Sequence, residues 1–279
     1  MRQPTLHAGG HTNSYTMLRK PKKRLGQHFL VSPHFKKKIV QNCNLGKDDT
    51  VLEIGPGRGE LTVLLAEACA SVVAVEFDRE LAVLLKDKFR DRPSVEIIAG
   101  DILRFDPARY FRHYAGKIKV VGNIPYQITS PIIQHLITHR NCIESIFITI
   151  QKELGERLTA KPGSKTYGAF SCFVQYYTEA KLLFVIKRGC FYPSPKVDSC
   201  FVRLNVRKEA AVKVKDEALF FRIIRAAFNK RRKTLRNSLQ EVVDAETIDR
   251  FFSLRHIDRN TRPELLSLEE FAYLSQMSG

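Results

Sequence analysis

The tetrapeptide Asn123-Ile124-Pro125-Tyr126 brings three chemically useful groups together within four residues. It follows an apolar run at 118–122 that predicts a strand ending in a turn. The Asn123 amide can accept hydrogen bonds from an amine, Pro125 fixes the backbone dihedral φ, and the Tyr126 ring offers a flat apolar face. Together these groups could hold a planar nucleobase by its face and by its exocyclic amine. The tetrapeptide alone is weak evidence, because Asn-x-Pro often only marks a turn.

A glycine-rich segment upstream supplies a candidate cofactor loop. Gly55-Pro-Gly57-Arg-Gly59 lies between a predicted strand at 51–54 and a predicted helix at 61–70. Glycines let the backbone turn tightly and approach a ligand closely. The G-x-G-x-G spacing is shorter than the dinucleotide fingerprint G-x-G-x-x-G and is more typical of S-adenosylmethionine enzymes. Taken alone, Gly55 could equally mark an ordinary turn between a strand and a helix.

Acidic side chains end the next two predicted strands. Glu76 follows the apolar run 72–75, where a carboxylate can accept hydrogen bonds from both ribose hydroxyls. Asp101 follows the run 95–99 and is placed to accept a hydrogen bond from an adenine amino group, with Ile102 beside it. Either acid alone would be interpreted as a solvated surface charge. Four consecutive strands, however, end in ligand-competent groups at their carboxyl ends, where ligands of open α/β sheets bind. We therefore predict a site for a nucleoside cofactor.

These groups need an alternation of strands and helices to position them, and the chain has one from about residue 36 to residue 150. Short β-branched runs separated by helical patterns predict a parallel sheet with helices on both faces. Two later runs, 182–186 and 200–206, predict an antiparallel pair that completes the sheet. The fold class is therefore α/β, with a Rossmann-like, mostly parallel sheet whose last strand is antiparallel.

We predict two domains. Residues 20–207 form the Rossmann-like domain, and residues 208–279 form a small helical domain with a helical pattern over 217–240. Asp244 and the Ser267-Leu-Glu-Glu270 segment are helix-opening signals there. Residues 1–19 are predicted to be a flexible extension. They lack the apolar core of a secretory signal, while an organellar transit peptide or an internal start at Met17 remain alternatives.

The charge of the chain indicates a polyanionic partner. The formal net charge is +17, and the first 47 residues contain ten Lys or Arg but no acid. RNA, DNA or an anionic membrane surface would suit such a field, although a protein that is merely basic is the simpler alternative. No apolar run approaches the roughly 18–20 residues of a membrane span. If that partner is RNA, the predicted contacts are Arg19, Lys20, Lys22, Lys23, Arg24, Lys230, Arg231, Arg232 and Lys233. Lys36–Lys38 form a further basic group that could instead be a solvated face.

The cysteine and histidine pattern predicts no metal site. The six cysteines are scattered and include no C-x-x-C pair, which favours reduced thiols in a cytosol. His135 and His139 have the spacing of metal ligands on a helix, but the sequence places no third ligand near them.

Several motifs of the chain resemble those of the ribosomal RNA adenine dimethyltransferase family. The resemblance extends from about Lys20 over nearly the whole remaining chain. Its motifs are Leu25-Gly-Gln-His-Phe-Leu30, Val51-Leu-Glu-Ile-Gly-Pro-Gly57, Val75-Glu-Phe-Asp78, Gly100-Asp101, Asn123-Ile-Pro-Tyr126, Phe191-Tyr-Pro-Ser-Pro-Lys-Val-Asp-Ser199 and Ala227-Phe-Asn-Lys-Arg-Arg-Lys-Thr-Leu-Arg-Asn-Ser-Leu239. The last two look like the small-subunit enzymes of the family, which dimethylate two adjacent adenosines near the 3′ end of 16S rRNA.

Two positions complicate this assignment within the family. Ile124 is common in the Erm enzymes, which modify 23S rRNA, whereas Leu is usual in the small-subunit enzymes. His28 replaces the Asn often seen in Gln-Asn-Phe-Leu, so that a side-chain contact there is expected to differ. The run from Asn229 to Leu239 favours the small-subunit enzymes. An Erm-type enzyme, or a non-catalytic RNA-binding factor on the same fold, remains an alternative.

The resemblance also implies a cofactor, S-adenosyl-L-methionine, and a set of site residues. The implied cofactor contacts are Gln27, His28, Leu30, Gly55, Gly57, Glu76, Asp101, Ile102 and Asn123. The implied catalytic residues are Asn123, Pro125, Tyr126 and Phe191. The partner would be 16S rRNA within a 30S assembly intermediate, and the protein would be a cytoplasmic monomer that needs neither metal nor membrane.

In this scheme the Asn123 side-chain oxygen and the carbonyl of Ile124 or Pro125 accept the two hydrogens of an adenine N6 amine. Tyr126 would stack on the adenine, and Phe191 would close the opposite face. A role for Phe191 as an ordinary core aromatic is the alternative.

Overall fold

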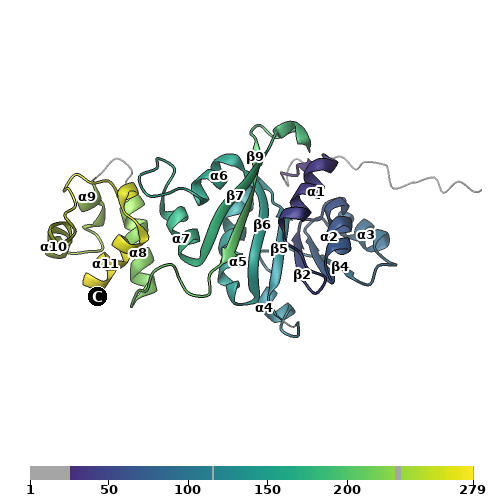
Figure 1. The fold of residues 1–279 in the computed structure, drawn as a ribbon, viewed down its shortest axis with the longest axis horizontal. Coiled ribbons are helices and arrows are strands. Elements are labelled where there is room, and N and C mark those ends of the chain that lie inside the picture. Colours follow the sequence, from purple (N-terminus) through teal and green to yellow (C-terminus); the bar gives the residue numbers. More distant parts are fainter. Residues whose placement is uncertain (1–25, 115, 230–233, 279) are drawn as a thin grey trace, which may run out of the picture.

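The computed structural model describes residues 26–114, 116–229 and 234–278. Its main feature is a seven-stranded sheet in the order β4-β3-β2-β5-β6-β9-β7 (Figure 1). The strands are β2 (Thr50–Ile54), β3 (Ser71–Glu76), β4 (Val95–Ala99), β5 (Ile118–Asn123), β6 (Ile143–Gln151), β7 (Thr178–Ile186) and β9 (Ser199–Val206). The strands from β4 to β6 pair in parallel, whereas β9 pairs antiparallel with both β6 and β7. The predicted mostly parallel sheet with an antiparallel last strand is confirmed.

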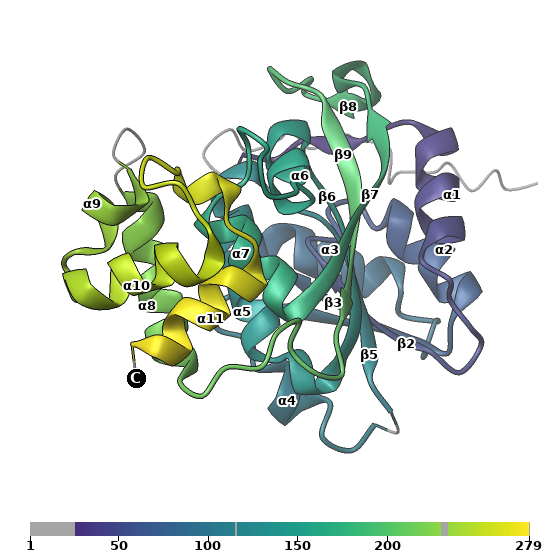
Figure 2. The same ribbon diagram turned by 60° about the vertical axis from the view of Figure 1, so that its left-hand side comes forward.

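Helices cover both faces of this sheet. They are α1 (Pro33–Asn42), α2 (Glu60–Ala68), α3 (Arg79–Lys88), α4 (Pro107–Tyr110), α5 (Thr129–Thr138), α6 (Lys152–Leu158) and α7 (Ala169–Tyr177). Because successive strand side chains point to opposite faces, Val51 and Val72 pack with α1, α2 and α3, whereas Leu52 and Val73 pack in the cluster that includes α5 and α7. Figure 2 shows α1 and α2 on one side of the sheet and α5 and α7 on the other.

A second, two-stranded sheet was not predicted from the sequence. It pairs β1 (Phe29–Leu30) antiparallel with β8 (Phe191–Tyr192), with Phe29 opposite Tyr192 and Leu30 opposite Phe191. The amide of Val31 extends the pairing by donating to the Cys190 carbonyl at 2.8 Å. This pairing fixes the segment from Gly26 onward beside the loop that precedes β9.

The C-terminal region is helical and lies at one end of the molecule (Figure 1). Its helices are α8 (Glu217–Asn229), α9 (Leu235–Leu239), α10 (Ala245–Arg255) and α11 (Leu268–Met277), and the short 3-10 helices of the chain are Tyr126–Ile128, Arg140–Cys142, Arg188–Cys190 and Pro263–Leu265. The prediction of one helical run over 217–240 was wrong. A new helix starts at Leu235 because the Thr234 side chain caps it by accepting from the Asn237 amide.

The other helix-opening signals are confirmed. The Asp244 carboxylate accepts from the Thr247 amide at 2.7 Å and caps α10. Ser267 and Glu270 form a reciprocal capping box at the start of α11. Rings of α7 and α8 pack together, and Glu217 accepts a hydrogen bond from the Tyr176 hydroxyl. The strand β9 ends at Val206. The domain boundary near residue 207 stays a prediction.

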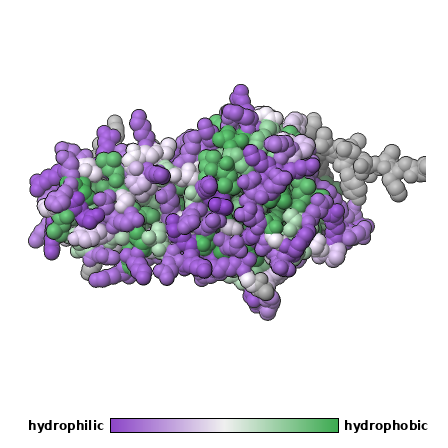
Figure 3. Space-filling model, in the orientation of Figure 1, coloured by the Kyte–Doolittle hydropathy of each residue, from purple (hydrophilic) through white to green (hydrophobic). Residues whose placement is uncertain are grey.

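The surface is mixed in character. Figure 3 shows hydrophilic residues over most of one face, with a hydrophobic patch in the region of α6, β7 and β9. Within the described ranges, none of the helices combines the length and the apolar character that a membrane span requires.

Candidate active site

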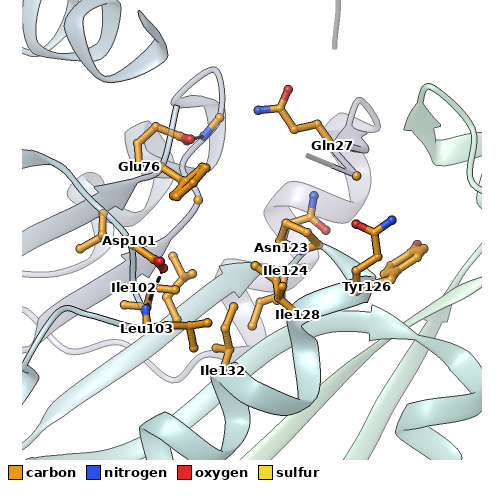
Figure 4. A pocket seen from close by; sticks show the side chains of 18 of the residues that line it. Gln27, Glu76, Asp101, Ile102, Leu103, Asn123, Ile124, Tyr126, Ile128 and Ile132 are labelled. Atoms are coloured by element: carbon orange, nitrogen blue, oxygen red, sulfur yellow. Dashed lines mark hydrogen bonds between the residues drawn. The ribbon is translucent and has the colours of Figure 1, made fainter. Parts of the chain in front are cut away.

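The predicted chemical groups meet in one cleft of about 280 Å³ at the carboxyl ends of β2 to β5. Glu76 and Asp101 lie on one side of it, and Asn123 and Ile124 lie on the other (Figure 4). The predicted residues that line it are Gln27, His28, Gly55, Gly57, Glu76, Asp101, Ile102, Asn123, Pro125 and Tyr126. Leu30 and Phe191 are the two predicted site residues of the described chain that do not line it.

The glycine loop has the backbone geometry that only glycine adopts easily. Gly55 has φ +66° and Gly57 has φ +59°. A Cβ on Gly57 would lie 2.9 Å from the Phe29 ring, which is too close, whereas a Cβ on Gly55 would meet nothing within 4 Å. Gly55 lines the cleft, so its missing side chain keeps that part of the cleft open.

Gly55→Ala is therefore expected to act on ligand binding as well as on stability. Gly116 is a matched control, because it also has a positive φ and open space around its missing Cβ but does not line the cleft. Both substitutions to Ala should cost about 1 kcal/mol in the free energy of unfolding. Only Gly55→Ala should also weaken cofactor binding, by about tenfold, in calorimetry. Equal cofactor affinities for the two variants would contradict the assigned role of the loop.

Glu76 is tied into the loop by both carboxylate oxygens. Its side chain is buried, with one oxygen accepting from the Gly57 amide at 3.0 Å and the other from the Asp78 amide at 2.8 Å. Burial raises the pKa of Glu76, while these backbone amides act in the opposite direction. Each oxygen keeps one further lone pair for a ligand, since a carboxylate has about four acceptor positions. Glu76 can therefore hold the loop and accept hydroxyl donors at once.

Asp101 orients its carboxylate by a local hydrogen bond. Its Oδ1 atom accepts from the Leu103 amide at 3.0 Å, at the turn after β4 (Figure 4). The neighbouring Ile102 side chain is buried against the core and lines the cleft. A carboxylate next to an apolar wall suits a planar heterocycle that carries an amine.

Asn123 is oriented by the backbone of the N-terminal segment. Its Nδ2 atom donates to the His28 carbonyl at 2.8 Å. A backbone carbonyl can only accept a hydrogen bond, so the amide nitrogen of Asn123 must face it. The side-chain oxygen Oδ1 is on the other branch of the amide and remains available as an acceptor at the cleft. The structure thus fixes which half of the Asn123 amide a ligand can use.

The Ile124 and Pro125 carbonyls, the two candidates for the second acceptor of the ligand amine, differ in the hydrogen bonds that they already accept. The Pro125 carbonyl already accepts from the Ile128 amide and from the Thr129 hydroxyl, both at 3.2 Å. The Ile124 amide donates to the Thr149 carbonyl, while the Ile124 carbonyl accepts no backbone hydrogen bond from the described residues. The Ile124 carbonyl is therefore the better acceptor for a ligand.

Tyr126 is held at its hydroxyl and against one ring face. Its hydroxyl lies 2.6 Å from the Ser199 hydroxyl. The His28 ring stacks on it with the centroids 5.6 Å apart and an interplanar angle of 24°. His28 Nδ1 in turn donates to the Pro193 carbonyl at 2.6 Å, since that carbonyl can only accept. His28 thus connects Tyr126 to the loop after β8.

Phe191 and Leu30 lie behind the cleft. They pair across β1 and β8, and both belong to the buried core on the α1–α3 side of the sheet. Phe191 is 3% exposed, so its ring is not positioned to stack on a base in this conformation. The arrangement matches the alternative interpretation of Phe191 as a core aromatic. Leu30 lines a smaller cavity of about 50 Å³ next to the cleft.

The cleft is also lined by residues that were not predicted from the sequence. Phe77 is 59% exposed and lines the cleft directly after Glu76, and this adjacency was the available signal. Ile128 and Ile132 also line it, from the turn and helix that follow Tyr126. Their spacing of four residues places them on one helical face.

The remaining predicted sites fall outside the cleft or outside the described chain. Arg19, Lys20, Lys22, Lys23, Arg24, Lys230, Arg231, Arg232 and Lys233 all lie outside the described residues. Lys36 pairs with Glu60, and the Lys38 ammonium lies over the Phe184 ring at 4.4 Å. His135 Nε2 donates to the Phe105 carbonyl at 2.8 Å, and nowhere in the described ranges do three or more potential ligands gather as a metal site would require.

Comparison with known proteins identifies the family. Residues 18–278 match the family described as "Ribosomal RNA adenine dimethylase". The chain belongs to the ribosomal RNA adenine dimethylase family. Its methyltransferase fold and enzymatic character follow from this membership.

Individual relatives agree with this family. The chain is 42% identical to "Ribosomal RNA small subunit methyltransferase A" of Moorella thermoacetica, over 92% of both chains. It is also 42% identical to the protein of that name from Clostridium acetobutylicum, over 91% of this chain and 92% of the relative. The structure of a dimethyladenosine transferase from Plasmodium falciparum has a TM-score of 0.74 and 25% identity, covering 88% of this chain and 96% of that one. The structure of the 23S rRNA methyltransferase ErmE has a TM-score of 0.73 and 24% identity, covering 90% of this chain and 99% of that one, and this likeness shows the fold alone.

Proposed function

We propose that this protein transfers methyl groups from S-adenosylmethionine to N6 of two adjacent adenosines near the 3′ end of 16S rRNA. The observation that carries the proposal is the fixed orientation of Asn123, which leaves its amide oxygen available at the cleft. The neighbouring Ile124 carbonyl accepts no backbone hydrogen bond from the described residues. Relatives that are 42% identical bear the name of a small-subunit enzyme, which favours 16S over 23S rRNA. The product would be N6,N6-dimethyladenosine.

The residues of the cleft fit S-adenosylmethionine. Glu76 can accept hydrogen bonds from the ribose hydroxyls, and Asp101 can accept one from the adenine amine. Gly55 has no side chain and leaves open space beside them. Ile102 and Phe77 provide apolar walls for the adenine ring. When bound, S-adenosylmethionine supplies the methyl group on a positively charged sulfur.

The residues of the chain bind, orient and activate the target amine. The N6 lone pair is delocalised into the adenine ring, which makes the amine a poor nucleophile. If Asn123 Oδ1 and the Ile124 carbonyl accept its two hydrogens, they favour a pyramidal nitrogen whose lone pair is free to react. Tyr126 would stack on the base, a contact worth roughly 1–3 kcal/mol. Fixing both reactants in line can remove roughly 7–11 kcal/mol of the barrier. No strong base is needed, because the ammonium product can lose its proton to water.

The Ile124 side chain does not favour the 23S alternative. It is 2% exposed and packs in the core cluster that includes α5, so an exchange between Ile and Leu there alters packing. The group expected to contact the base is the backbone carbonyl, which both residues have. The same motif can therefore serve adenines in either ribosomal RNA.

RNA binding is expected to depend steeply on salt. The protein has a formal net charge of +17. The basic residues near the N-terminus and at 230–233 would contact RNA phosphates, and each such contact releases counterions from the RNA. Affinity for a 16S rRNA fragment should fall by about a hundredfold or more between 50 and 200 mM salt if several phosphates are contacted. Filter binding across a salt series would measure it. A flat profile would argue against these basic groups as the RNA contacts.

We place the protein in the cytosol, acting as a monomer on a 30S assembly intermediate. Methyl transfer from labelled S-adenosylmethionine to unmethylated 30S particles, with 50S particles and free 23S rRNA beside them, tests the proposal. Label in 16S rRNA alone is expected. Label in 23S rRNA would favour the Erm-type reaction, and no label in any RNA would favour a non-catalytic RNA-binding factor.

A further inference from the structure

Glu53 is a buried acid that the proposed reaction does not use. It lies on β2, directly before the glycine loop, and its side chain is 2% exposed. Its Oε2 atom has no hydrogen-bond partner among the described residues. An ionised carboxylate buried without a partner is strongly unfavourable, and such a group usually stays neutral instead.

The surroundings of Glu53 favour the neutral form. In the sheet it is flanked by Ala74 of β3 and Val121 of β5, which offer no charge. Burial, together with the nearby Glu76 carboxylate, raises the pKa of Glu53 to a net value of about 7. The Thr62 hydroxyl of α2 and the Lys88 ammonium of α3 act in the opposite direction. Neither compensates fully, since Lys88 donates to the Arg58 carbonyl at 2.8 Å and Thr62 Oγ1 makes no hydrogen bond of standard geometry to any described residue.

Glu53 also faces a cavity that borders the cleft. This cavity, of about 50 Å³, is lined by Glu53 and by the charged residues Lys36, Arg58 and Glu60. Lys36 and Glu60 pair with each other, while Arg58 Nη2 is buried and has no hydrogen-bond partner in the part of the chain that the structure describes. The cavity and the cleft share Phe29, Gly55, Gly57 and Asn123 in their walls. A charged ligand in the cleft would therefore lie close to Glu53.

We propose that, near neutral pH, Glu53 carries a proton in a large share of the ligand-free molecules and releases it when S-adenosylmethionine binds. This inference rests on the proposed function, because it takes the positively charged cofactor as the ligand. The O–H bond of the carboxylic acid breaks, the proton leaves through the small cavity to the buffer, and the carboxylate stays to balance the cofactor's charge. Glu53 is thus a positioning residue for the cofactor.

The sign of the pH dependence follows from linkage. A cation near Glu53 favours its carboxylate form, so binding lowers the pKa of Glu53 and releases a proton. At pH 7 about half of the free molecules hold this proton, so about 0.5 proton should be released for each cofactor bound. Cofactor affinity should be about tenfold weaker at pH 6 than at pH 8. The number of protons released for each cofactor bound should approach zero above pH 8.

Isothermal titration calorimetry in buffers of different ionisation enthalpy measures this proton directly. Glu53→Gln keeps the shape of the neutral acid and should bind S-adenosylmethionine with no proton release and a flat pH profile. Glu67→Gln is the matched control, because Glu67 is an exposed acid on the same helix as Thr62, and its proton release should equal that of the wild type. Binding with the same release in Glu53→Gln as in the wild type would overturn this inference alone. A wild type that does not bind S-adenosylmethionine would overturn both this inference and the proposed cofactor.

A second measurement covers the case in which Glu53→Gln does not fold. In wild-type protein with ¹³C-labelled glutamate, one buried carboxyl should titrate near pH 7 and should become ionised at that pH when S-adenosylmethionine is added. If every glutamate carboxyl titrates at or below about pH 5 in the free protein, the inference is wrong.

Discussion

Asn123→Ala is expected to lower the rate of methyl transfer by about a hundredfold to a thousandfold, the loss typical of removing one group that stabilises a transition state. The substitution removes the oxygen that would accept a hydrogen of the adenine amine. It also removes the Nδ2 bond to the His28 carbonyl, which holds the N-terminal segment beside the cleft. S-adenosylmethionine should still bind within about tenfold of the wild type, because Glu76 and Asp101 remain.

Single-turnover methyl transfer and calorimetry on the same variant separate these two effects. Asn42→Ala is a matched control, since the Asn42 side chain also donates to a backbone carbonyl, that of Lys38, but lies on α1 away from the cleft. It should retain wild-type turnover. Near-normal turnover of Asn123→Ala would contradict the proposed grip on the amine.

Glu76→Ala is expected to weaken S-adenosylmethionine binding by about tenfold to a hundredfold. Hydrogen bonds to a charged group contribute about 1.5–3 kcal/mol, and each 1.4 kcal/mol changes the dissociation constant about tenfold. The substitution removes the ribose acceptor and also frees the Gly57 and Asp78 amides, so the glycine loop loses its anchor. Both effects act on the cofactor and neither acts directly on the RNA.

Calorimetry with S-adenosylmethionine measures the loss, and RNA binding in the same variant should be unchanged. Glu67→Ala, on the exposed side of α2, should leave both affinities at the wild-type value. If Glu76→Ala binds the cofactor as tightly as Glu67→Ala does, Glu76 is not a cofactor ligand.

The sheet could be predicted because its signals are local. Each strand from β2 to β6 is a short run of β-branched or apolar residues, and β-branched side chains pack well in a buried parallel sheet. The positions of Gly55, Glu76, Asp101 and Asn123 followed, since the carboxyl ends of neighbouring parallel strands lie at one edge. Sequence order alone therefore brought these four residues into one cleft.

The features that could not be predicted depend on contacts between distant residues. Leu30 pairs with Phe191, and Asn123 donates to the His28 carbonyl. Both contacts join residues far apart in the sequence, so no local sequence pattern predicts them. The core position of Phe191 follows from that pairing, and so does the His28 contact with Tyr126. The helical pattern over 217–240 misled for the opposite reason, because a cap at Thr234 outweighed a favourable run of residues.

The same limit applies to Glu53. In the sequence it is one more acid in a strand before a glycine loop, and nothing in the run 51–54 says whether a partner will reach it. Only the packed structure shows that its Oε2 atom has no partner among the described residues and that it lines a small cavity sharing wall residues with the cleft.

The central claim is that Asn123 and the Ile124 carbonyl hold the exocyclic amine of an adenine. Mass spectrometry of nucleosides from 16S rRNA, after unmethylated 30S particles react with the protein and S-adenosylmethionine, tests this claim most directly. We expect N6,N6-dimethyladenosine from two adjacent positions with the wild type and almost none with Asn123→Ala. Methyl groups on a ring nitrogen, on a ribose oxygen or on another base would contradict the account.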